Sequence, residues 1–241
     1  MNSIFAIIPA RSGSKGIKDK NLLEIKEKSL LEWTISAAKK CPSISKIFVS
    51  TDSTQYAEIA IALGADVPFL RPKKFAKDNS PDIEFVLHAL NEFKNKNEEP
   101  EMLVHLRPTT PLRDPHIIEN AISMLKDSKH ASSLRSIHEM PESAYKTMEI
   151  NEEGMLMPLN FINKDSIDIN APRQSFPKTY QANGYVDILS TASIRKTNEI
   201  HGDKILAFQT DYVTEIDCMD DFKYIEYLVT NNTSFYDKVF S

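Results

Sequence analysis

Short apolar runs alternate with longer amphipathic segments through the first 135 residues, and this alternation limits the fold more than any other feature. The apolar runs have the length of buried strands and lie at 4–8, 46–50, 66–70, 102–106 and 131–137. Apolar residues recur at helical spacing at 30–38, 56–63, 83–93 and 117–125. Because parallel strands need such helices as crossover connections, the sequence predicts an α/β fold with a three-layer, mostly parallel sheet.

The pattern breaks at residue 138 and returns near residue 183. Between 138 and 177, short strand-like pieces are mixed with many Pro and Asn residues, which predicts an inserted subdomain that leaves the sheet as a hairpin or arm. Beyond it, apolar runs at 183–190, 205–209 and 213–217 predict strands, and a last helix is expected within 220–231. We therefore expect a single domain over 1–241 with one insertion at 138–177.

The composition is that of a soluble globular protein without a large basic surface. A formal net charge of −5 argues against general binding to nucleic acid or to an anionic membrane, since both usually need a basic face. The apolar start lacks a basic leader, and no apolar run approaches the roughly 20 residues of a membrane span. The two thiols, Cys41 and Cys218, are expected to be free in a reducing compartment. These features predict a cytoplasmic protein with no nucleic-acid or membrane partner.

The loop after the first strand concentrates positive charge in this acidic chain. Its cations are opposed only by Asp19, and they are Arg11, Lys15, Lys18 and Lys20. Small residues at positions 12, 13, 14 and 16 allow backbone N–H groups to approach a ligand closely. Neither the Walker pattern nor the dinucleotide pattern G-x-G-x-x-G occurs here. Position and charge favour phosphate binding, and the alternative is a solvated basic loop.

Glu215 and Asp217 form a second candidate site. On the predicted strand 213–217 their side chains would point to the same side, because side chains alternate along a strand. Two carboxylates beside bound phosphates suit Mg²⁺, with phosphate oxygens and waters completing its six ligands. The alternative is that Asp217, Asp220 and Asp221 favour the start of the last helix through capping and charge.

Two further loops are polar in ways that helix packing does not require. Residues 107–115 contain three prolines, which suit either a rigid site loop or a structural connection to a helix. Arg173, Lys178 and Asn183 are candidates for binding a carboxylate or hydroxyl groups, against the alternative of plain surface residues. The six histidines show no metal-ligand spacing, and no G-x-S-x-G elbow for acyl transfer is present.

Seven motifs that span about residues 4–229 carry a resemblance to a known family. In order along the chain they are IIPARSGSKGIKDKNL, VSTDS, LRP, RPTTPLR, PRQ, NG and EID. They resemble the acylneuraminate cytidylyltransferases, which are the CMP-sialic acid synthetases and their bacterial relatives acting on legionaminic acid. The opening P-A-R-x-G-S-K-G-I-x-x-K-N is the most specific of the seven motifs.

The resemblance implies a fold, a reaction and a set of site residues. The fold would be of the nucleotidyltransferase (Rossmann-like) type, with 138–177 as a small dimerisation and sugar-binding arm in a homodimer. CTP and a nine-carbon α-keto sugar acid would give a CMP-sugar and pyrophosphate, with Mg²⁺. The residues implied are Arg11, Lys15 and Lys20 for catalysis; Ala10, Arg11, Ser12, Gly13, Ser14, Lys20, Asn21, Arg71, Ser80 and Asp82 for the nucleotide; Arg107, Lys146, Arg173 and Asn183 for the sugar acid; and Glu215 and Asp217 for the metal.

Two positions depart from the family pattern, and two other functions stay open. The family often has Asp where Glu215 stands, and sialic acid synthetases commonly have Gln at the position of Arg107, which makes legionaminate a competitor of N-acetylneuraminate as the substrate. One alternative is a 3-deoxy-octulosonate cytidylyltransferase with an eight-carbon substrate, although an S-x-R-L-P-type segment would be expected in its opening loop. The other is a nucleotide-binding module that has kept the fold and lost catalysis.

Overall fold

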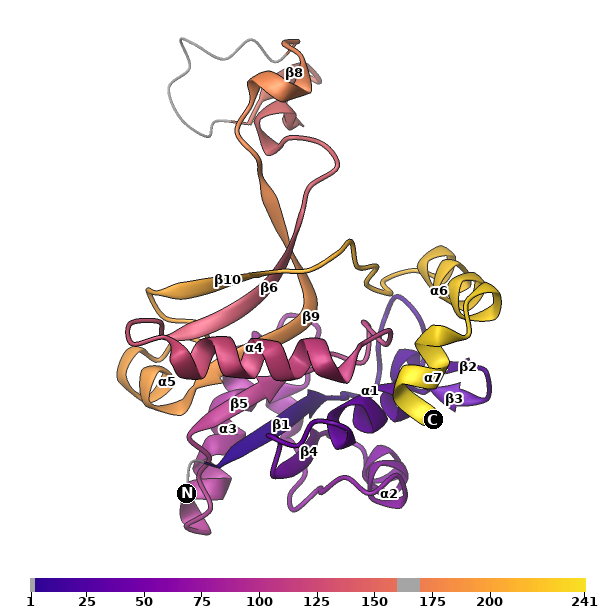
Figure 1. Cartoon of the computed structure of the whole chain (residues 1–241), viewed down its shortest axis with the longest axis vertical. Coiled ribbons are helices and arrows are strands. Elements are labelled where there is room, and N and C mark those ends of the chain that lie inside the picture. The colour runs from indigo at the N-terminus through magenta and orange to yellow at the C-terminus, as the bar shows by residue number, and fades with distance from the viewer. Residues whose placement is uncertain (1–2, 160–169) are drawn as a thin grey trace.

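The computed structural model describes residues 3–159 and 170–241, and a six-stranded sheet forms its centre (Figure 1). In the spatial order β10-β6-β9-β5-β1-β4, the strands are Ile205–Gln209, Ser133–Glu139, Tyr180–Ser190, Met102–His105, Ile4–Pro9 and Lys46–Ser50. β1 pairs in parallel with β4 and β5, and β10 pairs in parallel with β6. β9 runs antiparallel to both of its neighbours, β5 and β6. The expected α/β fold with a mostly parallel sheet is confirmed.

Helices cover both faces of this sheet. They are α1 (Leu30–Lys39), α2 (Thr54–Ala62), α3 (Asp82–Asn95), α4 (Pro115–Asp127), α5 (Thr191–Thr197), α6 (Met219–Asn231) and α7 (Ser234–Phe240). Successive side chains of β1 point alternately into two different cores, one on each face of the sheet. On one face, Ile4, Ala6 and Ile8 pack with residues of α1, α4 and α6. Phe5 and Ile7 pack with residues of α3. Because both faces are buried, β1 is apolar along nearly its whole length rather than alternating with polar residues.

Polar residues mark the points where several helices begin. The side chains of Ser29 and Ser53 accept hydrogen bonds from backbone N–H groups in the first turns of α1 and α2. Asp114 does the same for α4, where Pro115 occupies the first helical position. The Pro-rich segment that starts at Arg107 is therefore a connection between β5 and α4 with both ends fixed.

Two of the predicted strands are wrong. Segment 66–70 makes only an isolated bridge, between Asp66 and Phe48, because Pro68 has no N–H to donate to a ladder. Segment 213–217 forms no strand, since it crosses the carboxyl edge of the sheet and contacts the loop after β5, where Ile216 N donates to Thr109 O at 2.8 Å. Period-two alternation thus does not explain how Glu215 and Asp217 are placed. The helix α7 was not expected.

The chain leaves the sheet after β6 and forms an arm that projects from the body (Figure 1). Within the arm, β7 (Met148–Ile150) and β8 (Leu156–Pro158) form an antiparallel pair. The long strand β9 leads back from the arm into the sheet. Residues 160–169 of the predicted insertion 138–177 lie outside the described residues. A second small pair, β2 (Glu24–Ile25) with β3 (Lys28–Ser29), follows the basic loop.

Among the described residues, no helix combines the length and the apolar character that crossing a membrane would require. Cys41 is buried and Cys218 is exposed, and both are free thiols.

Candidate active site

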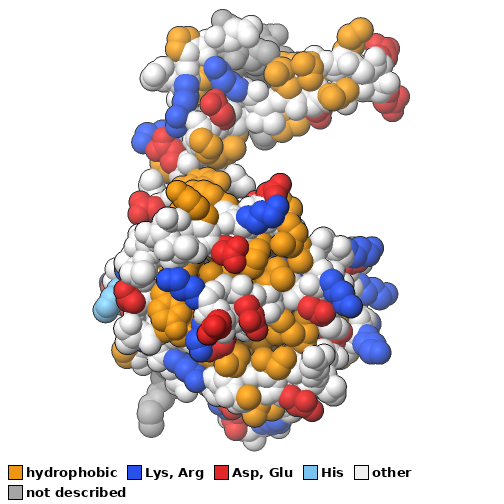
Figure 2. Space-filling view, turned by 90° about the vertical axis from the view of Figure 1, so that its right-hand side faces the viewer, with side chains coloured by type: hydrophobic (Ala, Val, Ile, Leu, Met, Phe, Trp, Pro, Cys, Tyr) orange, Lys and Arg blue, Asp and Glu red, His pale blue; other side chains and the backbone are white. Residues whose placement is uncertain are grey.

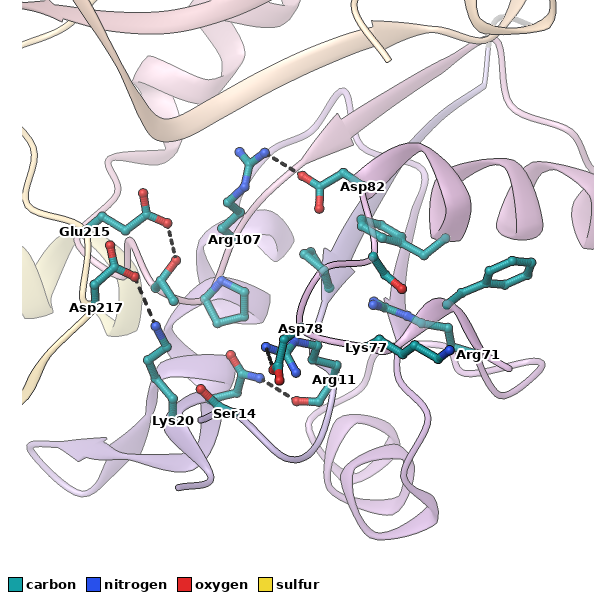
Figure 3. A pocket seen from close by; sticks show the side chains of 17 residues that line it. Arg11, Ser14, Lys20, Arg71, Lys77, Asp78, Asp82, Arg107, Glu215 and Asp217 are labelled. Carbon is teal, nitrogen blue, oxygen red and sulfur yellow. Dashed lines mark hydrogen bonds and ion pairs between the residues drawn. The ribbon is translucent and has the colours of Figure 1, made fainter. Parts of the chain in front are cut away.

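A pocket of about 270 Å³ opens at the carboxyl end of the parallel strands β1 and β5 (Figure 3). Ligands of open α/β sheets bind at this edge, and four segments that lie far apart in the sequence meet here. These segments are the loop after β1, residues 71–85, the loop after β5 and residues 215–217. The predicted site residues that line the pocket are Arg11, Ser14, Lys20, Asn21, Arg71, Ser80, Asp82, Arg107, Glu215 and Asp217.

The backbone of the basic loop is held against the end of β4. Ala10 N donates to Ser50 O at 2.9 Å, and the N and Oγ atoms of Ser12 both donate to the Asp52 carboxylate, at 2.8 and 3.0 Å. Gly13 has a φ of +71°, a value that favours glycine. These residues shape the loop from behind, whereas the pocket itself is lined by the neighbouring Arg11 and Ser14.

Two cations of the loop converge on one carboxylate. Arg11 Nη2 and Lys15 Nζ each lie 2.8 Å from an oxygen of Asp78. Both cations hold the pKa of that carboxyl group below its ordinary value, and the larger effect comes from Lys15. The Lys15 side chain is otherwise exposed. Asn21 is buried, and its Nδ2 donates to Arg11 O at 3.2 Å, which closes the loop on itself. Asp78 therefore already occupies the two cations, Arg11 and Lys15, that a phosphate entering the pocket would contact.

Lys20 joins the basic loop to the segment 215–217. Its Nζ donates to Ile216 O at 2.8 Å and to Asp217 Oδ1 at 3.2 Å (Figure 3). The approach is close: a Cβ added at Gly16 would lie 3.1 Å from Asp217 O. A side chain at position 16 would press against the backbone of Asp217, so the two segments touch closely at this glycine. The contact brings one cation and one carboxylate to the same side of the pocket.

Glu215 reaches the same region from a different set of contacts. Its Oε1 accepts a hydrogen bond from Thr109 Oγ1 at 2.8 Å, which fixes the carboxylate against the loop after β5. A Cβ at Gly184, where φ is +65°, would lie 3.2 Å from Thr110 Oγ1 and 3.5 Å from Glu215 Oε2. Loop contacts and a glycine in β9, rather than a strand, bring Glu215 to the pocket.

Arg71 forms the opposite wall of the pocket. Its Nε donates to Ser50 Oγ at 2.9 Å and its Nη2 to Ser50 O at 2.7 Å, while the guanidinium carbon lies 4.3 Å from the centre of the Phe85 ring. Burial lowers the pKa of Arg71 to about 10, so the group remains a cation at neutral pH. Its flat, buried guanidinium offers fixed hydrogen-bond donors to a planar polar ligand. Ser80 lines the same pocket, and its hydroxyl donates to Lys74 O at 3.2 Å, which leaves the Ser80 oxygen as an acceptor.

Arg107 is held between two carboxylates. Its Nη1 lies 2.9 Å from Asp187 Oδ2, and its Nη2 lies 2.8 Å from Asp82 Oδ2 (Figure 3 shows the second contact). Asp187 is 1% exposed and belongs to β9. Sequence reasoning missed Asp187, although a lone carboxylate inside the apolar run 183–190 was the available signal.

Arg113, which sequence reasoning also missed, is buried beneath the loop after β5. Its guanidinium donates to the carbonyl oxygens of Arg107, Gly184 and Tyr185 at 2.8, 3.0 and 2.6 Å, and also to Thr110 O. Burial lowers its pKa to about 10. The residue ties the loop that carries Arg107 to the glycine turn in β9. Its position at the end of the motif RPTTPLR was the only sequence signal.

The remaining residues implied for the sugar acid lie elsewhere. Lys146 and Arg173 belong to the arm, where Arg173 Nη2 lies 3.5 Å from Glu139 Oε1 and lines a separate cavity. Asn183 is buried in β9, and its Nδ2 donates to Thr210 Oγ1 at 2.8 Å. Within one chain, Arg107 is thus the member of this set that lines the pocket described above.

Comparison with known proteins places this pocket in a family context. A family model described as "Cytidylyltransferase" matches residues 5–236. The chain is 34% identical over 218 residues to the N-acylneuraminate cytidylyltransferase of Escherichia coli O18:K1:H7, an alignment that covers 90% of this chain and 49% of the relative. It is 39% identical over 123 residues to the CMP-N,N'-diacetyllegionaminic acid synthase of Legionella pneumophila, with coverage of 51% and 53%. The chain spans about half the length of the Escherichia coli relative, and the segment aligned with the Legionella relative spans about half of each protein.

A solved structure agrees with the fold. CMP:2-keto-3-deoxy-manno-octonic acid synthetase, determined as a complex with CTP, superposes with a TM-score of 0.71 over 95% of this chain and 99% of that one. The sequence identity is 14%, so the likeness concerns the fold alone.

Proposed function

The chain belongs to the cytidylyltransferase family, and on that premise we propose that it transfers CMP from CTP to a nine-carbon α-keto sugar acid and releases pyrophosphate. The acceptor is an acid of the N-acylneuraminate or legionaminate type, the two types for which the Escherichia coli and Legionella relatives are named. The observation that supports this function most is the contact of Lys20 with Asp217, which joins the basic loop to the paired carboxylates at one pocket.

In the proposed reaction, the anomeric hydroxyl oxygen of the acid forms a bond to the α-phosphorus of CTP. The bond between that phosphorus and the bridging oxygen breaks in line, pyrophosphate leaves with the electron pair, and the hydroxyl proton passes to solvent. Such transfers depend on positioning and charge neutralisation. Arg11, Ser14 and Lys20 hold the triphosphate, and Lys15 adds charge at the rim. We assign the binding of the cytidine to Arg71, Ser80 and Asn21, which line the same pocket.

The carboxylates of Glu215 and Asp217 fit a Mg²⁺ ion. Both line the pocket, and each already accepts a hydrogen bond, from Thr109 and Lys20 respectively, that orients it. The described residues hold no cluster of three potential ligands, so a Mg²⁺ ion bound here would have to take the rest of its ligands from substrate phosphates and water. When bound, Mg²⁺ would neutralise phosphate charge.

The arm supports a homodimer. Its β7–β8 pair exposes apolar side chains, which Figure 2 shows on the projecting part of the molecule. They are Met148, Ile150, Met155, Leu156 and Met157, with exposed fractions of 41–71%. A two-stranded pair is marginal on its own, and a contiguous exposed apolar patch is typical of an interface. We therefore include self-association through the arm in the proposed function, with Lys146 and Arg173 acting at the pocket of the partner subunit.

Pyrophosphate release from CTP with a panel of acids tests the proposed function. We expect release with nine-carbon acids, no release with eight-carbon 3-deoxy-octulosonate, and none in the Arg11→Ala variant, whose circular dichroism should match the unchanged protein. Release with the eight-carbon acid alone would assign the alternative cytidylyltransferase activity. Binding of CTP without release in any arm would assign a nucleotide-binding module, and either result would refute the proposal.

A further inference from the structure

A buried carboxylate lies directly behind the proposed acceptor side of the pocket. Asp187 is in the middle of β9, opposite His105 of β5 and Arg135 of β6 in the sheet register. Residues opposite each other in a sheet project from the same face, so these side chains form a row across three strands. Burial of an unpaired carboxylate is strongly unfavourable, which means that Asp187 needs a partner.

The partner of Asp187 is Arg107. Among the described residues, Arg107 Nη1, at 2.9 Å, is the hydrogen-bond donor to the Asp187 carboxylate, and Asp187 Oδ1 has none. His105 Nδ1 and His201 Nε2 each lie 4.0 Å from Asp187 Oδ2, and Arg135 Nε lies 3.9 Å from Oδ1. Burial lowers the pKa values of both histidines, so neither supplies the positive charge. The close cation comes from the pocket wall.

The guanidinium of Arg107 is therefore oriented from its buried side. Because Nη1 is fixed to Asp187, the opposite Nη2 points toward the pocket, where it meets Asp82 at 2.8 Å. Asp82 is 38% exposed and stands at the first residue of α3, so an anionic ligand can take its place on Nη2. Asp187, 1% exposed, cannot be exchanged in this way.

We propose that Asp187 is a positioning residue that holds Arg107 with one edge of its guanidinium toward the pocket, and that this edge determines the affinity for the sugar-acid acceptor. The inference rests on the proposed function, since it concerns the acceptor of that reaction. Arg107 touches the substrate, and Asp187 acts only through Arg107. Removing Asp187 should lower the affinity for the acid without changing the affinity for CTP, whose proposed contacts come from the basic loop and Arg71.

A double-mutant cycle tests this role in the full chain. We expect Asp187→Asn to raise the KM for the acid roughly tenfold, the loss typical of one charge-assisted hydrogen bond, with the KM for CTP unchanged. Arg107→Gln should do the same. In the Arg107→Gln background, Asp187→Asn should then have no further effect, because the group that it positions is gone. Ser133→Ala, which removes a buried hydroxyl of the same sheet, is the control and should leave both KM values unchanged, because Ser133 Oγ donates to His201 O and not to Arg107 or Asp187.

Each outcome decides a different point. Additive effects of the two substitutions, or equal effects on the KM values of CTP and acid, would overturn the positioning role while leaving the proposed function intact. An unchanged protein that releases no pyrophosphate with any acid would refute the proposed function instead. If Asp187→Asn alone fails to fold but the double variant folds, the pairing with Arg107 is supported; if both fail to fold, Asp187 has a structural role of its own and the proposal is wrong.

Discussion

Lys20 Nζ lies 3.2 Å from Asp217 Oδ1, although the two residues are 197 positions apart in the chain. The same ammonium group donates to Ile216 O at 2.8 Å and is mostly shielded, with 14% of the side chain exposed. The contact therefore joins the two sides of the pocket and sets a cation that we propose to bind phosphate directly beside a proposed metal ligand. In the proposed reaction, Lys20 and Asp217 act on the same triphosphate from adjacent positions.

Replacement of Lys20 should abolish most turnover without unfolding the protein. Loss of one charge-assisted contact to the transition state typically costs about 100-fold or more in kcat, so we expect that loss for Lys20→Ala and for Arg11→Ala. Steady-state pyrophosphate release measures kcat, and thermal unfolding checks the fold. Near-normal turnover in either variant would remove that residue from the proposed machinery. Lys26→Ala, a change at an exposed lysine between β2 and β3, should leave kcat unchanged.

Substitution of the paired carboxylates should shift the dependence on Mg²⁺. If Asp217 and Glu215 bind the ion, Asp217→Asn and Glu215→Gln should raise the Mg²⁺ concentration for half-maximal rate roughly tenfold or more, the effect of one lost charged ligand. Asp220→Asn is the matched control, because Asp220 pairs with Lys223 on the surface of α6. An unchanged titration for Asp217→Asn would assign that carboxylate to the helix start instead. EDTA should stop turnover in the unchanged protein, reversibly.

Removal of the Asp78 charge should strengthen nucleotide binding. Asp78 pairs with both Arg11 and Lys15 at 2.8 Å, so the phosphates of CTP must compete with it for the same two cations. Exposed ion pairs are weak and readily exchanged, and we expect Asp78→Asn to lower the dissociation constant of CTP roughly fivefold. Asp203→Asn, at an exposed position before β10, makes the same change in net charge and should have no effect. Weaker CTP binding in Asp78→Asn would show that Asp78 supports the nucleotide rather than competing with it.

The sequence was sufficient to predict the layered architecture but not every strand. A run such as 4–8 is apolar at each position only because both faces of β1 are covered, and that pattern is visible without coordinates. Segment 66–70 lies beside the edge strand β4, but it contains Pro68, which has no N–H to donate to a ladder, and the apolar residues around Pro68 concealed that local signal. Segment 213–217 crosses the edge of the sheet, and that path depends on residues far away in the sequence, so local patterns do not contain it.

The pocket shows the same division between local and distant information. Charge and position next to β1 were enough to predict that Arg11 and Lys20 would line a site, because both signals are local. Asp187 could not be assigned, since its pairing with Arg107 follows from the register that sets His105 opposite Asp187. Arg113 was missed for a related reason: its partners are backbone carbonyls of two separate segments, which leave no mark in the side-chain sequence.

Acid should destabilise the fold through its buried histidines. Burial sets the pKa of His105 well below 6.5, and the neighbouring Arg107 and His201 act in the same direction. Below pH 6.5 the folded state therefore binds fewer protons than the unfolded chain. The free energy of unfolding has its full value above that pH and falls as the pH decreases. Each such group contributes up to roughly 1.4 kcal/mol per pH unit. The thermal midpoint of His105→Gln, followed from neutral to mildly acidic pH, should fall less steeply than that of the unchanged protein; equal slopes would assign the effect to other histidines.

Arg173 provides the test of the arm, because it lies outside the pocket of its own chain. If the arm acts at the pocket of a partner subunit, an Arg173→Ala chain has a defective arm and an intact pocket, whereas an Arg11→Ala chain has an intact arm and a defective pocket. Each variant alone should lose at least about 90% of its activity, as expected for the loss of a charged substrate contact. Mixed after brief dissociation, the two variants should regain up to about a quarter of the activity, since in random reassociation half of the dimers carry one intact site. A mixture of Arg11→Ala with Lys20→Ala, whose defects lie in the same pocket, is the matched control and should regain no activity, because each pocket of a mixed dimer keeps one of the two defects. No recovery in the first mixture, or equal recovery in both mixtures, would contradict an arm that crosses between subunits.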